Sequence, residues 1–218
     1  MPKTAFWKLP TEKQNHFIET SIVEFSNQSY ENVSVKYISQ QIGIAKGTLY
    51  KYFENKKDLY LFLVEYAIAK KYQTIDRLLQ QSNENDLSEI LLQIYTSTAR
   101  FEVDFPVLSR FLYCVHREHP HHELGNLPQL LKKQACNHYR AILHDQQQKG
   151  NVRSDIPLEM LTFVVVQLGW GVRDYFLNNY PDAFDENEDL KSKTGTSLRE
   201  VAHNFASQLT LLVNKGLT

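Results

Sequence analysis

The chain has 218 residues, of which 42% are hydrophobic and 22% charged, a composition that excludes a disordered or fibrous protein. Its two cysteines, without a CxxC spacing, exclude a disulfide framework and a cysteine-rich zinc module. We expect a cytoplasmic protein, because the sequence has no apolar stretch typical of a signal peptide and no run near the roughly 18 apolar residues of a membrane span.

The formal net charge of −1 hides an uneven distribution along the chain. Residues 1–57 hold eight lysines and five glutamates, a charge of +3. Residues 58–218 hold sixteen basic and twenty acidic side chains, a charge of −4. This asymmetry is typical of a protein that presents one end to phosphates.

Apolar residues recur at helical spacing along the chain, which predicts an all-α fold. The first helix is expected over residues 11–27. Ser34 is a candidate N-cap for a second, short helix, and Gly43 stands where that helix must reverse through a positive φ. A third short helix is expected over residues 45–52.

Capping residues and a proline predict where the later helices begin and end. Asn55 is a candidate N-cap with an acid at the third helical position, and it begins a long fourth helix that reaches about residue 81. A similar pattern over residues 86–89 begins a fifth helix, which Pro106 must end. Further helices are expected at about 107–116, 127–148, 157–178 and 195–215, with a polar, acidic connection over 179–196.

The first three helices form a helix-turn-helix pattern, with a glycine at the second turn and a basic, aromatic third helix. Leu49 and Phe53 lie four residues apart and are expected to anchor the third helix in a small core that includes Phe25. Gly47 has no side chain, so its backbone could approach a base edge or a phosphate. The residues expected to face outward are Lys46, Thr48, Tyr50, Lys51 and Tyr52.

The run Lys46-Gly47-Thr48-Leu49-Tyr50-Lys51-Tyr52-Phe53, followed by Lys56 and Leu59, resembles the DNA-binding domain of the tetracycline-repressor (TetR) family over about residues 11–64. The resemblance implies a three-helix DNA-binding head over residues 1–57 and a helical ligand-binding and dimerisation body over 58–218. It also implies a ligand-responsive repressor: a homodimer that binds a palindromic operator and is released by a small molecule. Neither a cofactor nor a catalytic residue is expected.

The resemblance assigns eight residues to DNA binding. Those expected at phosphates are Ser34, Thr48, Tyr50 and Lys56, and those nearest base edges are Lys36, Lys46, Gly47 and Tyr52. The chain departs from the family pattern at Ala45, where a serine often begins the third helix. Without a side-chain oxygen at this position, the N-terminus of the recognition helix has no side-chain cap.

Two apolar stripes, over residues 161–175 and 198–212, are expected to form a dimer interface. The first of these segments is apolar on more than one side, which favours a second packing partner. By the resemblance, that partner is the same pair of helices in another chain. The residues expected at this interface are Leu161, Val165, Leu168, Val172, Val201, Phe205 and Leu209.

Aromatic residues are frequent between residues 95 and 176, and most of them must belong to an ordinary core. A regulator of this type also keeps a cavity in its body for a small molecule. Such a lining favours a flat or apolar ligand, and a cationic one if Glu102 faces inward. The candidate lining residues are Phe101, Glu102, Phe111, Tyr139, Phe163, Gln167 and Trp170.

Two other classes of function stay open. A helical module that binds a ligand or a protein, but no DNA, would show no salt-sensitive affinity for a duplex. A metal-dependent cytoplasmic enzyme would use the histidine cluster between His116 and His122. Pro120 interrupts a helix through that cluster, which favours an ordinary polar loop.

Overall fold

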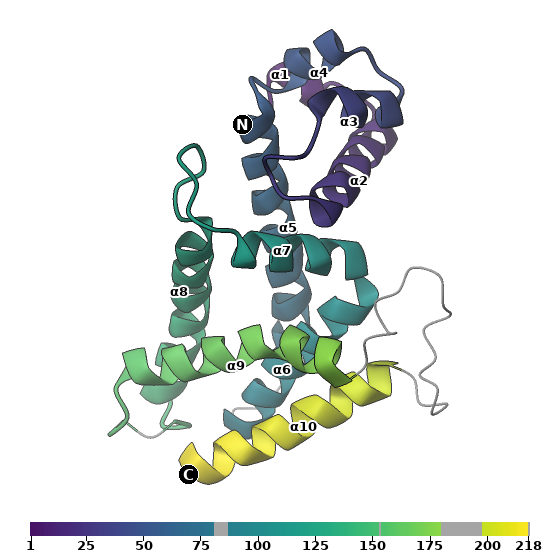
Figure 1. The fold of residues 1–218 in the computed structure, drawn as a ribbon. Coiled ribbons are helices and arrows are strands. Elements are labelled where there is room, and N and C mark those ends of the chain that lie inside the picture. Colours follow the sequence, from purple (N-terminus) through teal and green to yellow (C-terminus); the bar gives the residue numbers. More distant parts are fainter. Residues whose placement is uncertain (81–86, 153, 180–197, 218) are drawn as a thin grey trace. The chain divides into compact units, whose positions relative to one another are not determined.

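The computed structural model describes residues 1–80, 87–152, 154–179 and 198–217 (Figure 1). Within these ranges every regular element is a helix, and one isolated β-bridge joins His121 to Gly125. The expected all-α fold is therefore confirmed. No helix among the described residues is long and apolar enough to span a membrane.

The chain forms two compact units. The first unit contains Met1–Lys70 and Val107–Pro128, and the second contains Lys71–Pro106 and Gln129–Thr218. The division expected from the sequence, after residue 57, concerns function and stays a prediction.

The first unit begins with four helices. They are α1 (Thr4–Trp7), α2 (Thr11–Asn27), α3 (Val35–Ile42) and α4 (Lys46–Tyr52), of which α2 is the longest. The last three agree with the expected helix-turn-helix. The side chain of Ser34 accepts a hydrogen bond from the main-chain N–H of Tyr37 and caps α3, and Gly43 ends that helix with φ of 77°.

A cluster of aromatic rings forms the core beneath these helices. Phe6, from the four-residue helix that the sequence pattern did not predict, is fully buried, with its ring centre 5.3 Å from that of Phe53 and 5.5 Å from that of Phe17. Phe53 and Leu49 are also fully buried, so α4 is anchored by the two residues expected to do so. Phe25 lies instead against Tyr30 and Tyr60.

The long helix α5 (Lys56–Gln80) contributes residues to both units. The side chain of Asn55 accepts a hydrogen bond of 2.8 Å from the N–H of Asp58, which confirms the expected cap. The first unit also contains most of α7 (Pro106–Arg117), which begins at the proline expected to separate two helices. Proline suits the first position of a helix because its missing N–H has no partner there anyway.

The second unit is built from α6 (Leu87–Asp104), α8 (Leu127–Gln148), α9 (Leu158–Asn179) and α10 (Leu198–Leu217), together with the last part of α5. Helix α6 packs against both α9 and α10, as Figure 1 shows. Leu91, Ile94, Tyr95 and Val165 lie in the main hydrophobic cluster of this unit. The expected polar connection over residues 179–196 lies almost entirely outside the described residues.

Candidate nucleic-acid interface

The recognition helix α4 presents a basic, aromatic face to solvent. Lys46, Gly47 and Tyr50 are exposed, and the Lys46 ammonium lies 5.9 Å from the centre of the Tyr50 ring. Thr48 is half-buried. Since Leu49 is fully buried on the opposite side, the exposed groups are held on a fixed support.

The N-terminus of α4 has no side-chain cap, as the alanine there predicts. Ala45 has extended backbone angles, and its side chain makes no capping hydrogen bond. The first turn is closed by the backbone alone, with the N–H of Thr48 donating to the carbonyl of Ala45 over 2.8 Å. A serine at this position would add one acceptor for the free N–H groups of the first turn.

The C-terminus of α4 is held by Lys3, a contact that the sequence did not indicate. The Lys3 ammonium donates a hydrogen bond of 3.0 Å to the carbonyl of Tyr50. The main-chain N–H of Lys3 donates one of 2.8 Å to the carbonyl of Tyr52. Carbonyls in the last turn of a helix have no partner within the helix, so Lys3 satisfies two of them.

Two of the eight candidate residues lie at the start of α3. Ser34 is exposed, and its oxygen accepts the capping hydrogen bond, while its hydroxyl hydrogen remains able to donate to a phosphate. Lys36 is exposed in the first turn of α3, next to Tyr37, whose ring is 46% exposed. Basic and hydroxyl groups are therefore present on both helices of the motif.

Tyr52 and Lys56 are more firmly engaged within the protein. The Tyr52 ring is half-buried, 6.0 Å from the rings of both Phe6 and Phe17. The Lys56 ammonium donates to three main-chain carbonyls, those of Tyr30, Glu31 and Val33, at 2.8, 3.1 and 3.3 Å. An ammonium has three N–H donors, so this geometry favours a structural role for Lys56. Its predicted contact with phosphate stays a prediction.

Buried tyrosines and carboxylates of the first unit fix the turn between α2 and α3. Tyr30 donates from its hydroxyl to Glu123 over 2.7 Å, and Tyr60 donates to Glu118 over 2.7 Å. Burial, followed by the hydrogen bonds to these carboxylates, raises the pKa of both phenols. The hydrogen bond from Tyr30 lowers the pKa of Glu123. The turn is thus bound through Tyr30 to the loop after α7, and Tyr60 binds α5 to the same loop.

Five of the seven predicted ligand-binding residues lie in the second unit and away from its surface. Phe101, Glu102 and Tyr139 are buried, and Gln167 and Trp170 are partly buried. The Lys71 ammonium lies within cation–π distance of two of these rings, 5.7 Å from the centre of the Phe101 ring and 5.8 Å from that of Trp170. A pocket at these residues stays a prediction.

The other two predicted ligand-binding residues differ from these five in unit or in burial. Phe111 belongs to the first unit, where its ring is buried 5.6 Å from that of Tyr60. Phe163 is 54% exposed, because it stands on the side of α9 that faces away from the core. Phe163 belongs to the second unit but lies on its surface, and a ligand contact at Phe111 or Phe163 stays a prediction.

The predicted dimer residues also divide into two groups. Leu161, Val165, Val172 and Val201 are buried within a single chain, because the apolar stripes of α9 and α10 meet the chain's own core. Leu168, Phe205 and Leu209 are partly buried. Among the side chains that the structure describes, the large apolar ones exposed on α9 and α10 include Met160, Phe163, Tyr175 and Leu211.

The histidine cluster is divided between the last turn of α7, which holds His116, and the loop after it, which holds His119, His121 and His122. His121 accepts the N–H of Glu123 at Nδ1 and bonds Glu31 through Nε2 over 2.8 Å. No group of three or more histidine, cysteine or carboxylate side chains suited to a metal ion occurs among the residues that the structure describes.

Known proteins resemble this chain in both its helix-turn-helix sequence and its fold. Residues 17–62 match the family model described as bacterial regulatory proteins, tetR family. A curated relative is the biofilm operon icaADBC HTH-type negative transcriptional regulator IcaR of Staphylococcus epidermidis (strain ATCC 35984 / DSM 28319 / BCRC 17069 / CCUG 31568 / BM 3577 / RP62A). It is 25% identical over 183 residues, which make up 83% of this chain and 91% of the relative.

Solved structures share the fold over nearly the whole chain. A TetR family transcriptional regulator from Chloroflexus aurantiacus J-10-fl has a TM-score of 0.72 and 21% identity, with 100% of this chain and 98% of the other covered. The regulator FadR from Bacillus subtilis, solved in complex with stearoyl-CoA, has a TM-score of 0.66 and 18% identity, with 90% and 96% covered. The helix-turn-helix of this chain therefore matches the tetR family of bacterial regulatory proteins over residues 17–62, and the fold of the whole chain is similar to that of a solved TetR family transcriptional regulator.

Proposed function

We propose that this chain is a ligand-responsive transcriptional repressor that acts in the cytoplasm and has no enzymatic activity. The observation that carries the proposal is the short helix α4, which is anchored by Leu49 and Phe53 and exposes Lys46 and Tyr50. A helix of this kind suits the major groove, where lysine pairs with guanine edges and tyrosine with phosphates. Repression is favoured over activation because the relative IcaR is a negative regulator.

A homodimer is part of this proposal. A two-fold axis would place two recognition helices on the half-sites of a palindromic operator. The exposed apolar side chains of α9 and α10, which include Phe163 and Leu211, supply the surface that a second copy would cover.

Release from the operator would follow the binding of a small molecule in the second unit. The rings of Phe101 and Trp170, with Lys71 over both, form the part of that unit best suited to an apolar ligand with an acidic end. The relative FadR was solved with stearoyl-CoA, a ligand of this kind. Acyl-CoA thioesters are therefore the first ligands to test.

Selection of bound duplexes from a random pool tests the proposal and yields the operator in the same experiment. We expect a palindromic sequence whose half-sites lie about one helical turn apart. Lys46→Ala should weaken binding by about 1–3 kcal/mol at particular base pairs. The matched control is Lys132→Ala, which removes an exposed lysine from α8 in the second unit. Failure to enrich any duplex would favour a helical binding module without DNA.

A further inference from the structure

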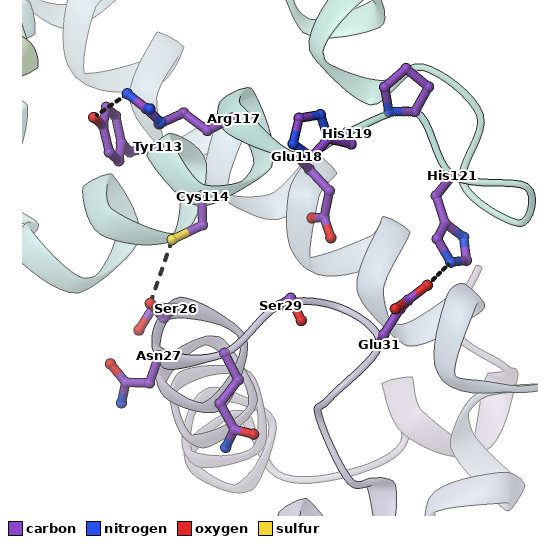
Figure 2. Close-up of a pocket in the computed structure, with 12 residues that line it drawn as sticks. Ser26, Asn27, Ser29, Glu31, Tyr113, Cys114, Arg117, Glu118, His119 and His121 are labelled. Atoms are coloured by element: carbon purple, nitrogen blue, oxygen red, sulfur yellow. Dashed lines mark hydrogen bonds and ion pairs between the residues drawn. The ribbon is translucent and has the colours of Figure 1, made fainter.

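The first unit contains a cavity of about 560 Å³ near the ends of α2 and α7 (Figure 2). Its wall is formed by the last turn of α2, the turn that leads to α3, the last turns of α7 and the loop after it. A volume of this size lies within the range of small-molecule sites. Every lining residue belongs to the first unit, so the cavity is separate from the residues of the second unit that we expect to bind the ligand.

The wall contains the carboxylate of Glu118, and the hydrogen bonds that this carboxylate accepts come from uncharged groups. Glu118 accepts hydrogen bonds from the hydroxyl of Tyr60 at 2.7 Å and from the N–H of Tyr30 at 3.3 Å. Both donors are neutral, and no cation bonds this carboxylate among the described residues. Helices α2 and α7 both end at the cavity, and the C-terminus of a helix carries about half a negative charge.

The basic groups of the wall do not cancel this charge. Arg117 turns towards Tyr113, with a hydrogen bond of 3.0 Å to its hydroxyl and the guanidinium 5.5 Å from its ring centre (Figure 2). His121 bonds the Glu31 carboxylate through Nε2 over 2.8 Å, so it is engaged with a different carboxylate from Glu118. His119 is exposed. Glu31 is thus bonded to His121, whereas no basic side chain among the described residues bonds Glu118.

We propose that this cavity is a second effector site, which binds a small organic cation with an ammonium or guanidinium group paired to Glu118. An aromatic ring and the carbonyl ends of two helices supply further partners of the kind that such cations prefer. The site goes beyond the proposed function, since it lies in the DNA-binding unit.

The contacts of Glu118 link the cavity to the DNA-binding helices. Tyr30 stands in the turn before α3, and its N–H makes the longer of the two bonds to this carboxylate. A cation at Glu118 competes for the same oxygen and loosens the turn. The carbonyl of Tyr30 is also bound by Lys56, at the start of α5, so the change reaches the support of α4. Occupancy should therefore lower operator affinity, by about fivefold or more.

Calorimetry on the chain without DNA tests the site directly, at fixed ionic strength. The probes are 1,4-diaminobutane and n-butylguanidine, and the neutral controls are butane-1,4-diol and n-butanol. We expect saturable binding of one probe molecule per chain and no binding of the alcohols. Absence of saturable binding by both cations, or equal binding of the alcohols, would overturn the proposal.

Three variants assign the binding to the cavity. Glu118→Gln removes the charge, and Ser29→Trp fills the opening from an exposed lining position; each should weaken binding by about tenfold or more. Glu65→Gln removes an exposed carboxylate of the same unit outside the wall and should bind as wild type. The site is ruled out if Glu65→Gln weakens binding as much as Glu118→Gln does, or if the first two variants, folded by circular dichroism, bind normally.

The effect on DNA is measured separately, with the selected operator and the same probes. Operator affinity that stays unchanged when the cavity is saturated would rule out its role as an effector site. If the chain binds no duplex at all, the proposed function fails, while the calorimetry still decides whether the cavity binds a cation.

Discussion

The ammonium of Lys3 donates a hydrogen bond of 3.0 Å to the carbonyl of Tyr50, although the two residues lie 47 positions apart. The main-chain N–H of Lys3 adds a second bond, to Tyr52. The segment before α2 therefore fixes the C-terminal end of the recognition helix. It adds to the anchoring of that end by Phe53, which follows α4 and is fully buried.

Lys3→Met is expected to lower operator affinity by about fivefold, since one hydrogen bond to a helix end is worth about 1 kcal/mol. Fluorescence anisotropy with the selected operator measures the loss. Lys8→Met removes another exposed lysine of the same segment and serves as the control. Equal losses in both variants would mean that Lys3 acts through its charge alone. Recovery in Lys3→Arg would support the hydrogen bond.

Lys56→Ala is expected to reduce the free energy of unfolding by about 1–3 kcal/mol, because three carbonyls lose a charged donor. Urea denaturation checks this value. The dependence of operator affinity on salt is the second measurement. A log–log slope that falls by about one would reveal the phosphate contact that the family resemblance assigns to this residue. An unchanged slope would show that Lys56 has a structural role and makes no phosphate contact.

The helix-turn-helix was predictable because its signals are local. Capping by Ser34, reversal at Gly43 and anchoring by Leu49 each depend on residues within one or two helical turns. The contact of Lys3 with Tyr50 joins distant parts of the chain, and no spacing rule indicates it. The helix α1 was also missed, since four residues with a single buried ring, that of Phe6, are too few for a periodic pattern.

The apolar stripe of α9 was correctly located as a buried face, but its partner was not determined by the sequence. Val165 is 1% exposed and lies in the core of its own chain. Periodicity shows that a face is buried, without showing whether the same chain or another covers it. Phe163 stood outside the stripe and is exposed instead.

Phe163→Glu and Leu211→Glu are each expected to shift the chain from dimer to monomer, because these side chains are 54% and 56% exposed on α9 and α10. Sedimentation at micromolar concentration checks the mass. Leu130→Glu places the same charge at another exposed leucine, on α8, and should leave the mass unchanged. Val165→Glu should unfold the second unit, since its side chain is buried. A wild-type chain that sediments as a monomer would contradict the proposed dimer.

Alkaline pH is expected to destabilise the first unit through Tyr60. Burial, followed by the hydrogen bond to Glu118, raises the pKa of this phenol well above its ordinary value of 10.0. The folded chain keeps the phenol neutral, so its stabilising effect is present below about pH 10 and is lost as the pH rises towards the raised pKa. The free energy of unfolding of Tyr60→Phe should therefore fall less steeply than that of the wild type above about pH 10. Denaturation at several pH values measures this difference. Tyr37→Phe, at an exposed ring, should follow the wild type.

Trp170 is expected to report the inducer, because it is partly buried in the second unit and shares Lys71 with Phe101. Lys71 lies on α5, the helix that begins beside the recognition helix and continues without a break to Gln80. An acidic group that binds Lys71 therefore acts on an element common to both units, and a coupling of about 1–3 kcal/mol would reduce operator affinity by about 5- to 150-fold.

We expect stearoyl-CoA to change tryptophan emission saturably and to release the operator over the same concentration range, whereas a flat aromatic cation should be repelled by Lys71. The change should persist in Trp7→Phe, which removes an exposed tryptophan of the first unit, and disappear in Trp170→Phe. A ligand that saturates the Trp170 signal while operator affinity stays constant would show that this part of the second unit is not coupled to DNA binding.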